Sequence, residues 1–313
     1  MSFLVPRAGT LLSHDIADYP EGIVLPVEKP YRWTSADVIR KLKFAAFRHF
    51  RKKNLKVGHA GTLDPLATGV LLVCIGSACK KAQELQDHDK EYVARIRFGA
   101  TTPSYDLEKE VDRRVPYTHI SAAAVQEALK GFLGEQEQVA PLFSAKSVDG
   151  VRAYEMARKL YKSGSFSEID AAALETLQRS RIVISELELL DFVPAAVSVI
   201  PEGQATVPEG DIPPETFART GSRSDVSGGM SPSGAMSNAS ERIHVADTSA
   251  LGLPEAAVRI VCSKGTYIRA FARDLGEALG SGAHLGGLVR SRSGDFRVED
   301  ALSVEQALEL LAP

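Results

Sequence analysis

The chain has 313 residues, with 37 Lys+Arg against 40 Asp+Glu, a formal net charge of −3 and 44% hydrophobic residues, which is ordinary for a soluble globular protein. No apolar run approaches the roughly 20 residues that span a bilayer, and the first residues do not form a secretory signal. Three scattered cysteines exclude a disulfide framework, and the absence of a CxxC pair argues against a metal site. We therefore expect a cytoplasmic protein with no membrane segment and no bound metal.

The mild overall acidity hides a strongly basic segment. Residues 29–56 contain ten Lys or Arg and a single acid, Asp37. Three phenylalanines are interleaved with these cations, namely Phe44, Phe47 and Phe50. The simpler interpretation is a solvated helix face, but basic residues interleaved with aromatic rings favour contact with nucleic acid.

A second segment has the opposite character. Residues 194–253 carry seven acids and three arginines, and 18 of the 40 residues from 201 to 240 are Gly, Pro or Ser. Such a stretch buries too little apolar area to offset the entropy that ordering it would cost. We predict a disordered insertion over 194–253.

The predicted elements of the first half mix helices and strands. Thr34 or Ser35 is expected to cap a helix with apolar residues at helical spacing. A continuously apolar run over residues 70–75 predicts a buried strand, and Ser77 is expected to cap a short helix after it. Strict alternation from residue 89 to 99 predicts a half-buried strand of an antiparallel sheet.

In the second half, apolar spacing predicts helices at 121–133, 152–161, 266–279 and 303–311. Strands at 181–192 and 256–262 flank the insertion and are expected to pair as a hairpin, since a long insertion at a surface turn costs little. The order predicts an α+β fold with a mixed, mainly antiparallel sheet flanked by helices. We expect one domain over residues 20–300, interrupted by the insertion, and a C-terminal helix within 301–313.

The segment GHAGTLDPLATGVL, residues 58–71, is the most unusual in the chain. Its glycines and Pro65 exclude a regular helix and place Asp64 on a loop that enters a buried strand. Catalytic groups are common in such loops, but an Asp-Pro turn with no catalytic role is the simpler interpretation. Without GK[ST] or GxGxxG, the segment is neither a P-loop nor a dinucleotide site.

Other candidate residues also have two interpretations. Arg269 lies in the first turn of a predicted helix, where a cation opposes the helix dipole and requires an anionic partner, unless it lies over apolar surface in solvent. Tyr92 is on the apolar face of its strand, so a core aromatic is the simpler interpretation. His59 and His284 lack metal-ligand spacing, and lone histidines are more often structural.

The order of these segments along the chain indicates that they belong to one functional pattern. Six motifs occur in sequence: KP…TS at 29–35, GHAGTLDPLATGVL at 58–71, DKEY at 89–92, SAK at 144–146, CSKGTYIRAFARDLG at 262–276 and GAHL at 282–285. This order strongly resembles the TruB family. The resemblance implies the pseudouridine synthase fold and an enzyme that flips uridine 55 out of the T loop of tRNA and isomerises it to pseudouridine without a cofactor.

The resemblance also implies roles for individual residues. Asp64 matches the catalytic aspartate, Arg269 its arginine partner, Tyr92 the tyrosine that stacks on the base and transfers a proton, and Leu288 an apolar residue of the pocket. Arg269 is expected to keep Asp64 ionised, and Asp64 attacks the ribose, attacks the base or removes a ribose proton. We expect RNA contacts from His59, Lys29, Arg40, Lys43, Lys90 and Lys264.

The sequence also departs from the family pattern. Pro103 stands where the family usually has an aspartate, which leaves Asp106 as the remaining acid of that turn. Only 13 residues follow Asp300, so we expect no C-terminal PUA domain. The expected partner is the tRNA T stem-loop, bound by a monomer. Two rival hypotheses are a nucleoside hydrolase or glycosidase, which normally needs paired carboxylates, and a catalytically silent RNA-folding factor.

Overall fold

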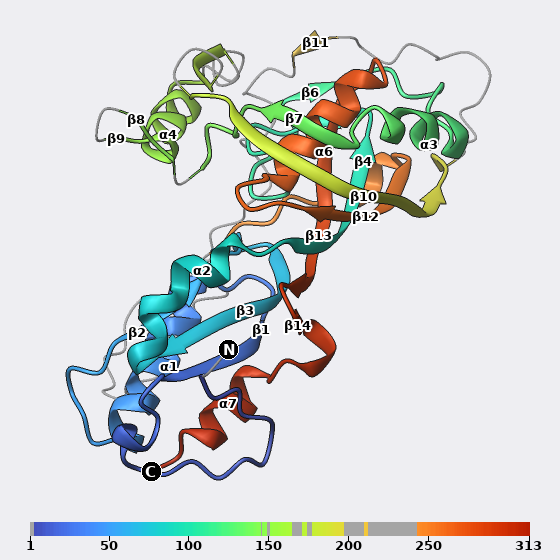
Figure 1. Ribbon diagram of the computed structural model, residues 1–313. Helices are drawn as coiled ribbons and strands as arrows, with labels where there is room; N and C mark the ends of the chain where they lie inside the picture. Colours follow the sequence, from blue (N-terminus) through green and yellow to red (C-terminus); the bar gives the residue numbers. More distant parts are fainter. Residues whose placement is uncertain are drawn as a thin grey trace.

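The computed structural model describes residues 3–144, 146–148, 151–164, 171–173, 177–196, 210–211 and 243–313. The molecule is elongated and has two halves that share one continuous sheet (Figure 1). One half contains α1, α2, α7 and both chain termini, and the other contains α3, α4 and α6.

The central sheet has the strand order β1-β3-β13-β4-β12-β10-β7, with β2 paired to β3 and β14 paired to β13. All these pairings are antiparallel except that of β13 with β3, which is parallel. The strands of this sheet are β1 (Ile23–Lys29), β2 (Val57–Ala60), β3 (Ala67–Ile75), β4 (Lys90–Phe98), β7 (Gly134–Gln138), β10 (Ser180–Val193), β12 (Glu255–Cys262), β13 (Ala283–Ser293) and β14 (Phe296–Arg297).

Short strands form two further small sheets in the described part of the chain: β11-β6-β5 and β8-β9. They are β5 (Ala100–Thr101), β6 (Arg113–Arg114), β8 (Ser147–Val148), β9 (Val151–Arg152) and β11 (Gly210–Asp211). The helices are α1 (Ser35–His49), α2 (Ala82–Asp87), α3 (Ala122–Lys130), α4 (Ala153–Ser163), α6 (Ile268–Ala278) and α7 (Val304–Leu310).

Each half has its own hydrophobic core on the sheet. Strand β3 is buried on both faces, because alternate side chains pack towards α1 and α7 on one side and towards α2 on the other. In the second half, α3 and α6 cover one face of β4, β10, β12 and β13. The opposite face is charged: Arg259 pairs there with Glu186, Glu188 and Glu91. This one-sided burial explains the alternation that predicted the strand at 89–99.

The predicted α+β fold and hairpin are confirmed: β10 and β12 pair antiparallel over Ile184↔Cys262 to Val193↔Glu255. Thr34 caps α1 with a reciprocal Asp37 contact. Several boundaries were wrong, among them the end of α3, which is Lys130 and not residue 133. Helix α6 begins at Ile268, two residues later than expected, and the turn after β3 is a 3-10 helix with Ile75, not Ser77, as its N-cap residue. Most of the insertion predicted over 194–253 lies outside the described residues.

Candidate active site

The loop between β2 and β3 carries Asp64 and is fixed by contacts to its backbone. The Leu63 N–H donates to the Ser35 hydroxyl at 3.0 Å, which ties the loop to the start of α1. The Ala67 N–H donates to the Asp64 carbonyl at 3.1 Å and closes the turn that Pro65 begins. The buried Arg290 guanidinium of β13 donates to two further loop carbonyls, at residues 61 and 62. The loop therefore presents Asp64 in one defined position.

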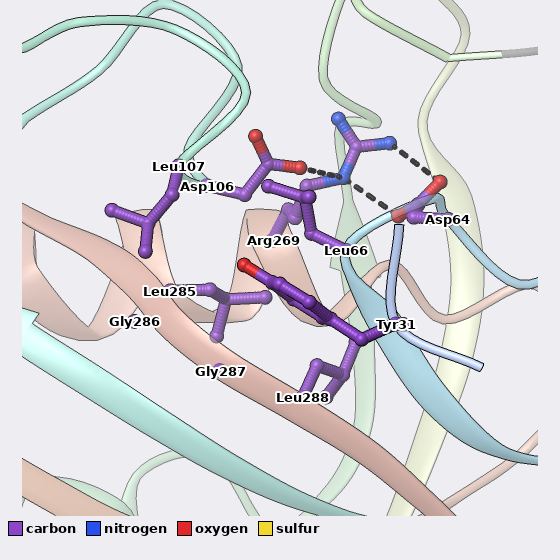
Figure 2. Close-up of a pocket in the computed structure, with 11 residues that line it drawn as sticks. Tyr31, Asp64, Leu66, Asp106, Leu107, Arg269, Leu285, Gly286, Gly287 and Leu288 are labelled. Carbon is purple, nitrogen blue, oxygen red and sulfur yellow. Dashed lines mark hydrogen bonds and ion pairs between the residues drawn. The ribbon is translucent and has the colours of Figure 1, made fainter. Parts of the chain in front are cut away.

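Helix α6 supplies the partner of Asp64. The Arg269 Nε donates to Asp64 Oδ2 at 2.9 Å, and its Nη2 donates to Oδ1 at 3.2 Å, a two-point contact (Figure 2). Gln138 of β7 holds the start of α6, because its side chain accepts from the Tyr267 N–H at 2.8 Å and donates to the Tyr267 carbonyl at 3.2 Å. Arg269 thus has the anionic partner that its position in the first helical turn requires.

A second carboxylate, that of Asp106, approaches Arg269 with its Oδ2 at 3.7 Å from Nε. The Ser104 hydroxyl and the Glu108 N–H donate to Asp106 Oδ1 at 2.6 and 2.9 Å. Burial raises the pKa of Asp106, and Arg269 and the Ser104 hydroxyl oppose that shift. Burial alone would lower the pKa of Arg269, but Asp64 and Asp106 raise it above its usual range. The guanidinium therefore stays charged.

The site opens into a pocket lined by eleven residues. Its charged residues are Asp64, Asp106 and Arg269. Its other lining residues are Tyr31, Leu66, Ala67, Leu107, Leu285, Gly286, Gly287 and Leu288. The Asp64 side chain is 38% exposed and that of Arg269 only 6%, so the carboxylate is the charged group that solvent and ligands reach. An accessible carboxylate in a mostly apolar pocket is suited to acid–base or nucleophilic chemistry.

The structure brings Leu288 into the pocket, opposite Ala67 in the parallel β13–β3 pairing. Tyr92 lies in β4 and is not part of the pocket lining. It packs against the cores of both halves, and burial raises the pKa of its phenol, while the nearby Arg290 opposes that shift. Its stacking on a base, which the sequence resemblance implied, therefore stays a prediction.

Two lysines expected to contact RNA are buried instead. The Lys29 ammonium donates to the Pro30, Trp33 and Pro65 carbonyls, and that of Lys90 donates to the Gln86 and His88 carbonyls. Burial lowers the pKa of each lysine to about 8. Both ammonium groups are thus engaged by backbone carbonyls inside the protein, and contact of these two lysines with RNA stays a prediction.

The remaining predicted RNA contacts lie closer to solvent. Arg40 and Lys43 are exposed on α1, and Lys264 pairs with the exposed Asp87 at 2.7 Å. His59 in β2 is half-buried, and burial lowers its pKa, with Arg290 adding to the shift. His59 Nδ1 is buried without a hydrogen bond to any described residue. Contact of these four residues with RNA stays a prediction.

Sequence reasoning missed Tyr31 and Arg290, and it named Asp106 without giving it a role. Tyr31 lines the pocket, Arg290 donates to a carbonyl of the loop that carries Asp64, and Asp106 is the second carboxylate near Arg269. The only available signals were the acid at 106 in the turn after the tyrosine strand and the arginine at 290 within an otherwise apolar strand pattern. Nothing in the local pattern distinguished Tyr31.

Other kinds of site are not found in the part of the chain that the structure describes. Its histidines, cysteines and acids form no group of three or more that could hold a metal ion. None of its helices has the length and apolar character needed to cross a membrane.

Comparison with known proteins places the chain in a family. Residues 48–199 match the TruB family pseudouridylate synthase (N terminal domain). The protein called tRNA pseudouridine synthase B in Phocaeicola vulgatus is 42% identical over 294 residues, which cover 94% of this chain and 95% of that protein. The protein of the same name in Bacteroides thetaiotaomicron is 43% identical over 93% of this chain and 94% of its own length.

A solved structure gives a weaker likeness. The structure described as "Crystal Structure of a Cbf5-Nop10-Gar1 Complex" aligns with a TM-score of 0.51 at 21% identity. The alignment covers 92% of this chain and 54% of that one, so this chain spans about half the length of the solved chain. This likeness supports the fold alone.

The mainly antiparallel sheet carries a candidate active site, in which the buried Arg269 holds the accessible carboxylate of Asp64 at an apolar pocket. With relatives above 40% identity over more than nine-tenths of both chains, the chain belongs to the TruB family of pseudouridylate synthases. Enzymes of this family are isomerases. The resemblance inferred from the six motifs is confirmed.

Proposed function

We propose that this enzyme isomerises uridine 55 in the T loop of tRNA to pseudouridine. The single observation that carries the proposal is the two-point Asp64–Arg269 contact at the mouth of an otherwise apolar pocket. The relatives named tRNA pseudouridine synthase B support tRNA as the substrate. The enzyme would act as a monomer in the cytoplasm, where tRNA is modified.

The reaction breaks the N1–C1′ bond of the nucleotide, turns the uracil and joins its C5 to C1′; C5 loses a proton and N1 gains one. Uridine and pseudouridine are isomers, so the reaction needs no external oxidant or reductant and no energy source. The nucleotide must first leave its stack, since its glycosidic bond is inaccessible inside a folded T loop. The pocket would then take up the extruded uracil.

Asp64 is the reactive group in this proposal. As an ionised carboxylate it either attacks C1′, attacks the base or removes a ribose proton, and the three routes remain alternatives. Arg269 fixes the direction of the carboxylate lone pairs, because its Nε and Nη2 each contact one carboxylate oxygen. Leu288 contacts the uracil, and Tyr92 is proposed to exchange a proton with it from the junction of the two cores.

RNA outside the pocket would be bound by exposed cations. Arg40 and Lys43 on α1, together with Lys264 and His59, are proposed to contact the tRNA. Contacts of this kind position the substrate through its phosphates and do not read its sequence.

The experiment that tests the proposal is Asp64→Asn, which removes the charge and keeps the size of the side chain. We expect release of tritium from C5 of labelled uridine in a tRNA transcript to fall by at least about 1,000-fold, because a reactive group is lost. Binding of the tRNA, measured by filter retention, should change by less than about threefold.

The same assay separates the rival functions. Turnover of Asp64→Asn near that of the unmodified enzyme contradicts the assignment of Asp64. Free uracil as the main product of the unmodified enzyme would indicate a nucleoside hydrolase. An RNA-folding factor would release no tritium, and its folding activity would survive Asp64→Asn.

A further inference from the structure

Arg32 lies at the rim of the pocket, and its backbone is tied to the loop that carries Asp64. It directly follows Tyr31, which lines the pocket. The Arg32 N–H donates to the carbonyl of Pro65, the residue after Asp64, at 3.0 Å. The Lys29 ammonium donates to the same carbonyl at 3.2 Å. The half-buried Arg32 side chain therefore starts from a fixed point close to the reactive carboxylate.

The guanidinium of Arg32 reaches a segment from a distant part of the chain. Its Nη2 donates to the Ile243 carbonyl at 2.7 Å. Three residues further on, the Ala246 N–H donates to the Leu107 carbonyl at 2.8 Å. Leu107 lines the pocket as Tyr31 does, and Figure 2 shows these two side chains coming from separate segments. The contacts of this distant segment thus link the guanidinium to a second part of the pocket lining.

The positive charge of Arg32 has no counter-ion among the described residues. Apart from the bond to Ile243, its guanidinium makes no hydrogen bond or ion pair with them. Its Nε is buried and has no hydrogen-bond partner. The guanidinium of Arg269, by contrast, meets two carboxylates. A partly desolvated cation without an anion costs free energy that the folded enzyme alone does not recover.

The backbone of Arg32 adds a second cost. Its φ is +63°, in the left-handed region where glycine is favoured and a long side chain is strained. Since glycine would relieve this strain, backbone stability does not explain an arginine at this position. A strained backbone and an unneutralised charge beside a reactive group are typical of a residue that binds a ligand. The partner that the charge lacks is an anion.

We propose that Arg32 binds a backbone phosphate of the RNA next to the uridine whose base enters the pocket. The inference rests on the proposed function and adds a contact beside its reaction centre. The extruded nucleotide carries its phosphates only a few bonds from C1′, where the glycosidic bond breaks. A planar guanidinium matches phosphate oxygens, and Ile243 uses only one of its five N–H groups. The contact holds the ribose in place while the base turns.

The first experiment measures the Kd for a tRNA transcript at several salt concentrations. Each phosphate contact releases counter-ions, so its loss lowers the slope of log Kd against log salt by about 0.7–0.9. Arg32→Gly and Arg32→Gln should both show this decrease and bind at least about fivefold more weakly. Arg32→Lys keeps the charge and should keep the slope.

The second experiment locates the phosphate. Two synthetic T stem-loop RNAs each carry an uncharged methylphosphonate, in place of the phosphate on the 5′ or the 3′ side of uridine 55. Binding is measured in the Asp64→Asn background, which prevents turnover. One of the two replacements should weaken binding at least about fivefold. With Arg32→Gly added, the same replacement should change Kd by less than about twofold, because the contact is already absent.

Arg51→Gly is the matched control. Arg51 also has a left-handed backbone, with φ +50°, but it follows α1, whereas Arg32 precedes it. The 15 residues of this helix separate the two arginines by roughly 22 Å. With Arg51→Gly the methylphosphonate should weaken binding as much as without it. Neither glycine variant should lower Tm by more than about 3 °C, because relief of the strained backbone offsets the freedom that glycine gains in the unfolded chain.

Three results would overturn the inference while the proposed function stands. The first is an unchanged salt slope in Arg32→Gly with a Kd within twofold of the unmodified enzyme. The second is a methylphosphonate effect that is absent from both RNAs or persists in full in Arg32→Gly. The third is a slope that falls equally in Arg32→Lys, since the charge would then be irrelevant. Absence of tritium release from the unmodified enzyme would instead contradict the proposed function itself.

Discussion

The guanidinium of Arg269 contacts two carboxylates that differ in exposure. The Asp64 side chain is 38% exposed and faces the pocket, whereas that of Asp106 is 8% exposed and receives hydrogen bonds from Ser104 and Glu108. Only Asp64 is therefore available to a substrate. Asp106 acts through Arg269: it supplies a second negative charge that fixes the guanidinium and with it the orientation of Asp64.

This division of roles predicts the effect of Asp106→Asn, which keeps the shape and removes the charge. We expect the single-turnover rate to fall by roughly 10- to 100-fold, which corresponds to about 1.5–3 kcal/mol for a lost contact with a charged group. The Kd for tRNA should stay within about threefold, because Asp106 is buried and does not reach the RNA. Rapid-quench kinetics and filter binding measure the two quantities separately.

Ser104→Ala is the matched control, because it removes one of the two hydrogen bonds to Asp106 and leaves both carboxylates charged. Its rate should lie between those of the unmodified enzyme and Asp106→Asn. If Asp106→Asn reacts as fast as the unmodified enzyme, Asp64 alone is sufficient to orient Arg269 and the positioning role is wrong.

Among the secondary structure elements, the parallel pairing of β3 with β13 determines where the loop that carries Asp64 lies. It sets Ala67 opposite Leu288 and Gly69 opposite Arg290, and so brings the loop that carries Asp64 against the pocket wall. Gly69 has φ +102°, and a Cβ there would lie 2.2 Å from the Arg290 carbonyl oxygen. Both the backbone conformation and the close approach of the two strands require glycine at this position.

Gly69→Ala should therefore destabilise the protein by about 3 kcal/mol or more, since the atoms that must move belong to a backbone in the sheet. Gly58→Ala is the control: it lies in the neighbouring β2, and its added Cβ meets nothing within 4 Å. Its unfolding free energy should change by less than about 1 kcal/mol. Urea denaturation of both variants measures this, and equal stabilities would contradict the proposed constraint.

The elements that local pattern determines could be predicted, and the contacts between them could not. Residues 70–75 are apolar because β3 is buried on both faces, so its sequence alone indicates a strand. The approach of Asp106 to Arg269 joins residues more than 160 positions apart, and no local period encodes it. Lys29 illustrates the same limit: its basic neighbours suggested RNA contact, but the remote Pro65 carbonyl is one of its partners.

At the scale of the whole molecule, the active site lies where the two cores meet. Tyr92 and Leu288 each pack against both cores, and β13 runs from one half of the sheet into the other. The pocket therefore depends on the sheet remaining continuous across the two halves. The free energy of global unfolding measures this dependence. The buried His284 at the start of β13 makes that free energy depend on pH.

His284 is fully buried, and its Nδ1 donates to the Ala100 carbonyl at 2.9 Å. Burial lowers its pKa from 6.5 to about 4, although the hydrogen bond to Ala100 opposes that shift. Between these pH values the unfolded chain binds a proton that the folded chain does not. The stability is thus fully present above pH 6.5, and the unfolding free energy falls as the pH falls through this window, by on the order of 3 kcal/mol in total.

The variant His284→Asn tests this prediction, because its amide retains a donor for the Ala100 carbonyl and does not titrate. It should be less stable than the unmodified protein near neutral pH, since an evolved core contact is replaced. The difference in unfolding free energy between the two proteins should shrink by about 2–3 kcal/mol between about pH 7 and pH 4.5. Only the unmodified protein loses stability through protonation of His284 in its unfolded chain. Urea denaturation at several pH values measures the difference. A difference that stays constant would show that other groups cause the acid sensitivity of the sheet.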